Sequence, residues 1–483
     1  MNNVTPKLRE NQVAEVWQRQ LVKGMELLSE KGDALEIIYP GRLNDDRGAD
    51  FRDAVISLNG RMLRGDVEIH VRSGSWIDHK HHRDPVYNRV ILHVVMWHSG
   101  STVTRLQNGG EIPVLALSRY LEIPLKPPVK TSSFDTFMSL PCLNATRRIN
   151  ANALAGLLDE AGDQRFYLKT ARFQKEMERM SAGQSLYRGV MGALGYSRNK
   201  LPFLELADRL PLHILESPAD GGLSDSASLT RNQALLLGTA GFLAGQYGEY
   251  LWRAGFDGTQ ISELDKVWAS RRHSRAMTPD DWRFFKVRPN NSPLRRLAAM
   301  GLLLLRYRET GLLNGLLGLV TEMPEGQDHY GLERGLLISG NANRTGLSGP
   351  AGAGLPFLGR ARAADIIINI LLPFTSAWSR HVSRPEPGRK ALDLYGCYQG
   401  AALNSIEKHM AGQLGLSRGM IQAARRRQGI IHIYASLCIR GRCLVCPLTQ
   451  LEAGSDIQVE AGHPVGPETE IAAGGDHGGI VGA

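Results

Sequence analysis

The spacing of the apolar residues changes near residue 148, and this change constrains the fold more than any other feature of the chain. Before it, short runs such as "ALEIIYPGRL" and "YNRVILHVVMWHS" have the length and β-branched content of strands. After it, apolar residues recur at helical spacing, as in "LAGLLDEAGDQRFYLKTARFQKEMERM". We therefore expect an α+β protein, in which an N-terminal mixed sheet with flanking helices is followed by a larger, mainly α-helical region.

Three segments follow from this change. Residues 1–148 are expected to form an α/β domain, and residues 149–450 a mainly helical domain that ends in a cysteine cluster. Residues 451–483 are rich in Gly, Ala and acidic residues, and their low apolar content predicts a disordered tail. A length of 483 residues agrees with more than one domain.

The clearest local signal is a hairpin with Asn59-Gly60 at its turn. Its second strand contains "GDVEIHV" (residues 65–71), in which Asp66, Glu68 and His70 alternate with apolar residues and so share one face. Two acids and an imidazole are costly to bury together unless they coordinate a cation or one another. If this face is buried it should hold a metal, whereas an exposed face would be ordinary surface.

The hairpin register decides which further acid joins that face. With a two-residue turn, Asp53 lies opposite Asp66. Phe51 then lies opposite Glu68, and Asp50 is on the other face. A one-residue bulge would reverse this and bring Asp50 beside Glu68. The sequence leaves both registers open.

The order of helix, strand, "GADF", hairpin, "GDVEIHV", helix and strand resembles the core of the PD-(D/E)XK nuclease superfamily. The resemblance implies a restriction-endonuclease-like fold and a site for Mg²⁺ or Mn²⁺. By position it implies Asp50 and Glu68 as metal ligands and the carbonyl of Ile69 as a backbone ligand. Glu15 matches an extra acid on the first helix of some members. His70 stands where the superfamily has Lys, and an imidazole can position or deprotonate a water but lacks a permanent charge.

The implied activity is Mg²⁺-assisted hydrolysis of a phosphodiester, with Asp50, Glu68 and His70 as catalytic residues. The alternative is a non-catalytic nucleic-acid-binding protein with a degenerate nuclease fold and a structural metal site. The stretch that includes "PGRLNDDRGADFRDAVISL" and "SWIDHKHHRDPVYNRVILHVV", together with "CIRGRCLVCPL", also resembles a bacterial family catalogued only as a domain of unknown function. That resemblance extends to about residue 450 and implies no activity.

The segment after the hairpin is rich in histidine and suggests a second kind of metal site. His79, His81 and Asp84, with His70 or His93, would supply the mixture of imidazole and carboxylate that suits Zn²⁺ or Mn²⁺. A solvated loop whose histidines cap backbone groups is the simpler interpretation. A zinc hydrolase that acts on a small substrate is a third hypothesis, although no helix or strand carries a motif such as H-E-x-x-H.

The cysteines form a second cluster, near the end of the chain. Cys438, Cys443 and Cys446 are spaced C-x4-C-x2-C, which suits Zn²⁺ or an iron–sulfur cluster. Both kinds of site normally need a fourth ligand, and the candidates are Cys397, Cys142 and, for zinc, His432. Three ordinary thiols are the alternative. An odd total of five cysteines in a large chain argues against a disulfide framework and favours a reducing compartment.

The charge distribution favours nucleic acid as a partner. The net charge is +9, and the last 35 residues contain six acids and no Lys or Arg, so the other 448 residues carry about +15. Arginines near the expected site and a run near the C-terminus are candidate phosphate contacts, although solvated arginines are an equal alternative. They are Arg42, Arg47, Arg72, Arg418, Arg425, Arg426 and Arg427. The chain has no run of 18 apolar residues and no signal-peptide pattern at its start, so we expect a cytoplasmic protein without a membrane partner.

Overall fold

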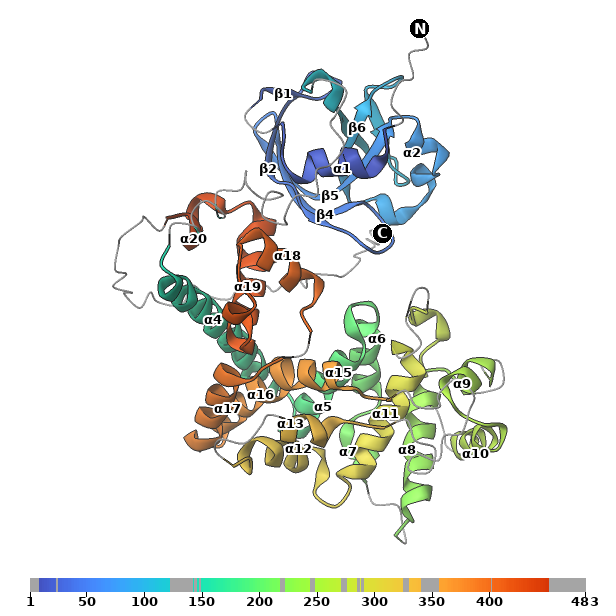
Figure 1. Ribbon diagram of the computed structural model, residues 1–483. Coiled ribbons are helices and arrows are strands. Elements are labelled where there is room, and N and C mark those ends of the chain that lie inside the picture. Colours follow the sequence, from blue (N-terminus) through green and yellow to red (C-terminus); the bar gives the residue numbers. More distant parts are fainter. Residues whose placement is uncertain are drawn as a thin grey trace. The chain divides into compact units, whose positions relative to one another are not determined.

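The computed structural model forms two compact units, which Figure 1 shows. It describes residues 8–22, 25–121, 142, 146, 149–217, 222–243, 248–270, 276–284, 287, 291–324, 330–339, 356–400 and 402–450. Within these residues, unit 1 consists of 8–164, 403–422 and 426–450, and unit 2 of 165–402 and 423–425. The expected tail, residues 451–483, lies outside the described residues.

Unit 1 is built on a curled, mixed sheet with the strand order β1-β2-β4-β5-β6-β8-β7. The short strand β3 also pairs with β4 but lies outside this order. Strands β5, β6 and β8 are parallel to one another, and the other pairs are antiparallel. The strands are β1 (Leu27–Leu28), β2 (Ala34–Tyr39), β3 (Arg42–Leu43), β4 (Phe51–Leu58), β5 (Arg61–Arg72), β6 (Val90–Trp97), β7 (Val103–Arg105) and β8 (Glu111–Ala116). The Asn59-Gly60 hairpin joins β4 to β5, as its turn signal predicts.

Helix α1 (Glu10–Gln18) packs against β5 and carries an apolar stripe. Val13, Val16 and Trp17 of this helix are buried, and the Trp17 Nε1–H donates to the carbonyl of Pro40 at 2.9 Å. The crossover from β5 to β6 contains α2 (Ser75–Asp78) and two 3-10 turns, η1 (His81–Arg83) and η2 (Pro85–Tyr87). This short crossover supplies the histidines of the candidate site.

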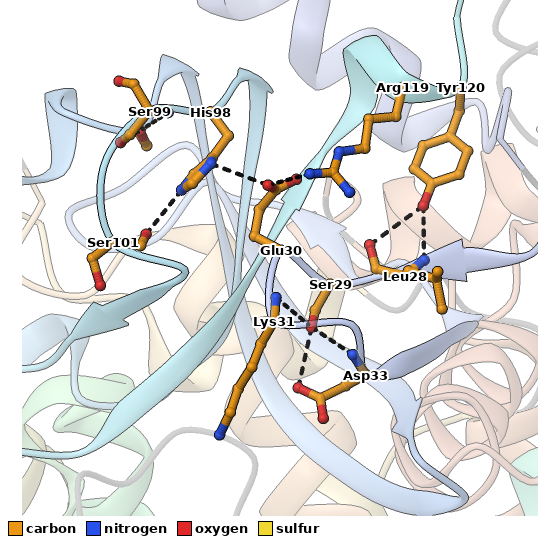
Figure 2. A network of polar contacts seen from close by, with 11 residues as sticks. Leu28, Ser29, Glu30, Lys31, Asp33, His98, Ser99, Ser101, Arg119 and Tyr120 are labelled. Atoms are coloured by element: carbon orange, nitrogen blue, oxygen red, sulfur yellow. Dashed lines mark hydrogen bonds and ion pairs between the residues drawn. The ribbon is translucent and has the colours of Figure 1, made fainter.

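The turn after β1 is tied to the far side of the curled sheet by a polar network, shown in Figure 2. The backbone N–H of Glu30 donates to the carbonyl of Val114 in β8 at 2.8 Å. The buried Glu30 carboxylate pairs with Arg119 at 2.6 Å and with His98 at 3.1 Å. The Tyr120 hydroxyl accepts the N–H of Leu28 at 2.8 Å. These contacts hold the curl because they join the segment beside β1, at one end of the strand order, to β8, the last strand but one.

C-terminal helices complete unit 1. They are α18 (Ser405–Gln413), α19 (Ala424–Ser436) and α20 (Pro447–Gln450), and they pack with the first part of α4 (Ala151–Met177). Ile430 and Tyr434 of α19 share a buried cluster with Tyr39 and Val55 of the sheet. The sheet and a segment more than three hundred residues later in the sequence therefore have one core.

Unit 2 is helical and is centred on a large apolar core. Its helices are α5 (Ala182–Leu194), α6 (Tyr196–Arg209), α7 (Leu212–Glu216), α8 (Asp225–Thr239), α9 (Gly248–Ala254), α10 (Gly258–Ala269), α11 (Pro293–Arg306), α12 (Gly311–Thr321), α13 (Tyr330–Leu336), α15 (Arg360–Ile366), α16 (Leu372–His381) and α17 (Pro385–Cys397). The predicted change from a mixed sheet to a mainly helical region is confirmed. Among the described residues, no helix is both long and apolar enough to span a bilayer.

Candidate metal centre

A β-bulge in strand β4 settles the register of the hairpin. Next to the turn, Ala54 pairs with Gly65, but beyond the bulge Phe51 pairs with Val67 instead of Glu68. The extra residue is accommodated at Asp53, whose φ of 61° is left-handed, a conformation that Asp tolerates better than most residues. This shift of one residue places Asp50 beside Glu68.

Asp50 and Glu68 are linked by backbone hydrogen bonds. The N–H of Asp50 donates to Glu68 Oε2 at 3.1 Å, and the N–H of Ile69 donates to Asp50 Oδ2 at 3.0 Å. Burial and the charge of Glu68 raise the pKa of Asp50 to about 7. Burial raises the pKa of Glu68 to about 8, against the lowering effect of the Asp50 N–H. Without a bound cation, Glu68 is therefore mostly protonated at neutral pH and Asp50 is about half protonated.

Three imidazoles gather beside Glu68, and two of them contact its carboxylate. Among the described residues, ring nitrogens of His70, His79 and His81 lie within 4.8 Å of one another. Glu68 Oε1 is 3.1 Å from His81 Nε2 and 3.6 Å from His70 Nε2. His70 Nε2 is also 3.2 Å from His79 Nδ1. Two of the three clustered imidazoles, those of His70 and His81, thus also contact the Glu68 carboxylate.

The crossover after β5 brings the second and third histidines to this point. His79 ends helix α2, and His81 begins the following 3-10 turn. Lys80 between them has a left-handed φ of 62°, which reverses the chain direction and turns both neighbours toward the sheet. Trp76 of α2 packs against the His81 ring and donates its Nε1–H to the carbonyl of Arg105 at 3.1 Å.

Two further side chains fix the orientation of His70. Its Nδ1 is 2.8 Å from His93 Nε2, and His93 Nδ1 is 2.8 Å from the Thr104 hydroxyl oxygen. If His70 presents the lone pair of Nε2 to a metal, its Nδ1–H donates to His93 and the His93 Nδ1–H donates to Thr104. Burial and the other imidazoles lower the pKa of His70 to about 2, and burial lowers that of His93 to about 3. Both rings are therefore neutral, as ligation requires.

The donor set fits a transition metal. His81 Nε2 is buried and forms no aligned hydrogen bond with the described residues, although Glu68 Oε1 is 3.1 Å away. Burial lowers the pKa of His81, so its ring binds a proton weakly. A protonated His81 is therefore a less favourable partner for Glu68 than a metal cation would be. Three imidazoles with a carboxylate are typical ligands of Zn²⁺ or Mn²⁺, whereas Mg²⁺ prefers oxygen donors.

Helix α1 contributes a different acid from the expected one. Glu15 forms an ion pair with Arg19 at 2.5 Å on its own helix. Glu10, at the start of the helix, is the acid whose charge raises the pKa of both Asp50 and Glu68. Helical phase is the signal that identifies it, because Glu10 lies three residues before the buried Val13 and therefore near the buried stripe.

Asp66 shares the face of Glu68 but belongs to another network. Its Oδ1 accepts the N–H of Asp53 at 3.2 Å and lies 3.6 Å from Arg89. Asp53 in turn accepts the hydroxyl of Tyr434 from helix α19 at 2.8 Å. Asp66 thus supports the bulge and the docking of the C-terminal segment, and the structure does not bring it to the histidines.

The other predicted residues have separate partners. Asp84 pairs with Arg47 at 2.5 Å and caps the N–H of Val86, so it is outside the histidine cluster. Arg72, at the end of β5, is exposed.

In the C-terminal arginine run, two side chains form ion pairs within unit 1. Arg426 pairs with Asp159 at 3.0 Å, and the buried Arg427 pairs with Glu407 at 2.8 Å. Two arginines of this run therefore stabilise the packing of unit 1. The sequence had suggested phosphate contacts or a solvated helix face instead.

The cysteines fall into two groups. Cys438, Cys443 and Cys446 line one small cavity in unit 1, and Cys142 lines the same cavity. Cys397, the other candidate fourth ligand, lies in unit 2, where it is exposed at the end of α17.

The fold and the site define an α/β protein whose curled sheet carries a cluster of histidine and carboxylate side chains, in which His70, His81 and Glu68 are buried and His79 is exposed. The chain belongs to the family described as "Protein of unknown function (DUF2851)", whose family model matches residues 10–335. The match includes the strands and the crossover that build the site, whereas the three clustered cysteines lie beyond it. Neither the curated proteins nor the solved structures contain a match to the chain.

Proposed function

We propose that this protein is a metal-dependent phosphodiesterase that cleaves nucleic acid. The metal is held by His70, His79, His81 and Glu68, and Asp50 is the adjacent carboxylate. The observation that carries the proposal is the cluster of three imidazoles, two of which also lie within 3.6 Å of the Glu68 carboxylate. The buried members of this set, His70, His81 and Glu68, are costly to bury together without a cation.

The order of the elements supports the nuclease class. Helix α1, antiparallel strands β2, β4 and β5, the crossover with α2, and the parallel strand β6 follow one another as the resemblance to the PD-(D/E)XK superfamily requires. The bulge at Asp53 gives Asp50 and Glu68 the adjacency that the two acids of that core need. A restriction-endonuclease-like fold for unit 1 is part of this proposal.

His70 stands where the superfamily has Lys, and this difference changes the metal that we expect. A neutral, buried imidazole that is hydrogen-bonded to His93 cannot replace the charge of a Lys, but it is a good ligand. We therefore assign the site to Mn²⁺ or Zn²⁺ before Mg²⁺.

A bound divalent ion would supply Lewis-acid polarisation of a phosphate oxygen and a lowered pKa for an attacking water. The residues of the chain orient that chemistry. His93 and Thr104 hold the His70 ring in one tautomer, which keeps Nε2 directed at the site. Asp50 Oδ2 is engaged by the Ile69 N–H, so its other oxygen is the one that can accept a proton from water.

The charge of the chain supports an anionic polymer as substrate. The residues before the acidic tail carry about +15, which attracts a phosphate backbone and raises its association rate. The proposal includes no sequence preference: of the arginines near the site, Arg47 pairs with Asp84 and Arg72 is exposed.

The test uses the full chain, stripped of metal and reloaded separately with Mn²⁺, Zn²⁺ or Mg²⁺. Labelled single-stranded DNA, double-stranded DNA and RNA are incubated with each form and cleavage is measured. We expect cleavage with Mn²⁺ or Zn²⁺, and a loss of at least about 100-fold in Glu68→Gln, because the variant lacks an anionic ligand.

His98→Gln is the matched control, since His98 also pairs with a buried Glu but lies in the Glu30 network of Figure 2. It should retain the wild-type rate. Cleavage that survives Glu68→Gln would contradict the proposal. Strongly salt-dependent binding without cleavage in every metal would instead support a non-catalytic nucleic-acid-binding protein.

A further inference from the structure

Four cysteines from distant parts of the sequence line one cavity in unit 1. Cys142 comes from the segment that follows the sheet, whereas the other three belong to the C-terminal loop and turns η9 (Cys438–Arg440) and η10 (Cys443–Val445). The cavity measures about 20 Å³. Its other lining residues are mainly apolar: Tyr39, Met410, Gln413, Leu414, Ile433, Leu437, Leu448 and Thr449. None of the four cysteines forms a disulfide.

The surroundings of these thiols suit metal ligation. The side-chain N–H of Gln413 points to two sulfurs, Cys142 Sγ at 3.4 Å and Cys438 Sγ at 3.8 Å. The same amide and all four sulfurs line the one cavity. Thiolates that are crowded in an apolar cavity need a cation, and amide N–H groups commonly support sulfur ligands.

The loop that carries three of the thiols is built into the sheet. Gly441 has a left-handed φ of 66°, and a Cβ at this position would lie 2.9 Å from Val55 Cγ1 of β4. The Arg64 guanidinium donates to the carbonyl of Arg440 at 3.2 Å. The backbone N–H of Cys446 donates to the carbonyl of Cys443 at 3.2 Å, which closes the second turn. The thiols are therefore held by packed backbone.

The sulfurs are spread more widely than a single zinc ion requires. Four thiolates around one Zn²⁺ lie about 3.8 Å apart, because each Zn–S bond is about 2.3 Å and the geometry is tetrahedral. No three of the four sulfurs, all of which belong to described residues, lie within 4.8 Å of one another. An iron–sulfur cluster holds its four cysteines farther apart, around inorganic atoms that occupy the centre.

We propose that Cys142, Cys438, Cys443 and Cys446 bind an iron–sulfur cluster that fastens the C-terminal segment to the sheet. The C-x4-C-x2-C spacing with one remote cysteine is one of the patterns that hold such clusters. The cluster joins residue 142 to residues about three hundred positions later, so it closes a very long loop and restrains the unfolded chain. This inference does not depend on the proposed phosphodiesterase activity.

The test begins with the full chain purified without oxygen. Iron and acid-labile sulfide are measured, together with absorption near 400 nm and the electron paramagnetic resonance spectrum of the reduced protein. We expect iron and sulfide in the wild type and at least about a fivefold lower content in Cys142→Ser. Cys397→Ser is the matched control, because this exposed cysteine lies in unit 2, and it should retain the full content.

A second variant guards against a simple failure of Cys142→Ser to fold. Gln413→Leu removes the amide N–H from two sulfurs but leaves every thiol in place. We expect it to keep its iron and to have a more negative reduction potential, because hydrogen bonds to the sulfurs favour the reduced cluster. Zinc at the four thiols, an absence of iron after anaerobic purification, or loss of iron in Cys397→Ser would each overturn the proposal.

Discussion

The substitution Glu68→Gln should stabilise the metal-free protein while it removes metal binding. Glu68 is 5% exposed, and its pKa in the fold is about 8, against an ordinary value of 4.5. At pH 7 the unfolded chain carries an ionised carboxylate at this position, whereas the folded protein must hold a proton there. Glutamine has nearly the same shape and its oxygen can still accept the N–H of Asp50.

The expected gain in the free energy of unfolding follows from the pKa shift of Glu68. Because pH 7 lies about 2.5 units above 4.5, and each unit is worth about 1.4 kcal/mol, we expect the variant to be about 3 kcal/mol more stable at pH 7. A raised folded pKa means that wild-type stability is complete below the unfolded pKa and falls as the pH rises toward 8. At pH 5 the difference should therefore shrink to about 1 kcal/mol.

Urea unfolding of chelator-treated protein at pH 5 and pH 7 measures this difference. Trp76 fluorescence reports on the site, because its ring packs against His81 and His93. The transition that belongs to unit 1 is identified as the one that changes in Trp76→Phe. If the two proteins are equally stable at pH 7, or if their difference is the same at both pH values, the burial argument for a metal centre fails.

Three further predictions concern the supports of the site and of the fold. His93→Ala should weaken metal affinity about 10–100-fold in a calorimetric titration, because His70 loses the partner that orients it. Gly441→Ala should lower the free energy of unfolding by about 1–2 kcal/mol, measured with urea, because the left-handed backbone penalises a Cβ. Glu407→Gln and Arg427→Met should each destabilise by about 3 kcal/mol, and the double variant should recover most of that loss, since only the single changes leave a buried charge without its partner.

The sequence by itself determined the local elements. The alternation of "GDVEIHV" gave a strand with Glu68 and His70 on one face, and Asn59-Gly60 gave the turn before it. The helical spacing after residue 148 gave a helical region. These features are local because a strand or a helix sets the direction of each side chain from its neighbours a few residues away.

Several features of the site required the tertiary structure. The bulge at Asp53 decides whether Asp50 joins Glu68, and a shift of one residue moves every side chain of a strand to the opposite face. The left-handed Lys80 turns two histidines of a crossover toward one point. The Asn59-Gly60 signal predicts the turn. It does not predict the change of register several residues away, because that change depends on how the strand packs against the rest of the protein.

The longest-range feature is the cysteine cavity. Spacing alone grouped Cys438, Cys443 and Cys446, because they lie within one loop. It favoured Cys397 as the fourth ligand, with Cys142 and, for zinc, His432 as alternatives. The packing of helix α19 on the sheet brings Cys142 to the others and leaves Cys397 in unit 2. The sequence determined which side chains are available for chemistry, whereas contacts between residues hundreds of positions apart are decided by the packing of whole elements, and only the tertiary structure contains them.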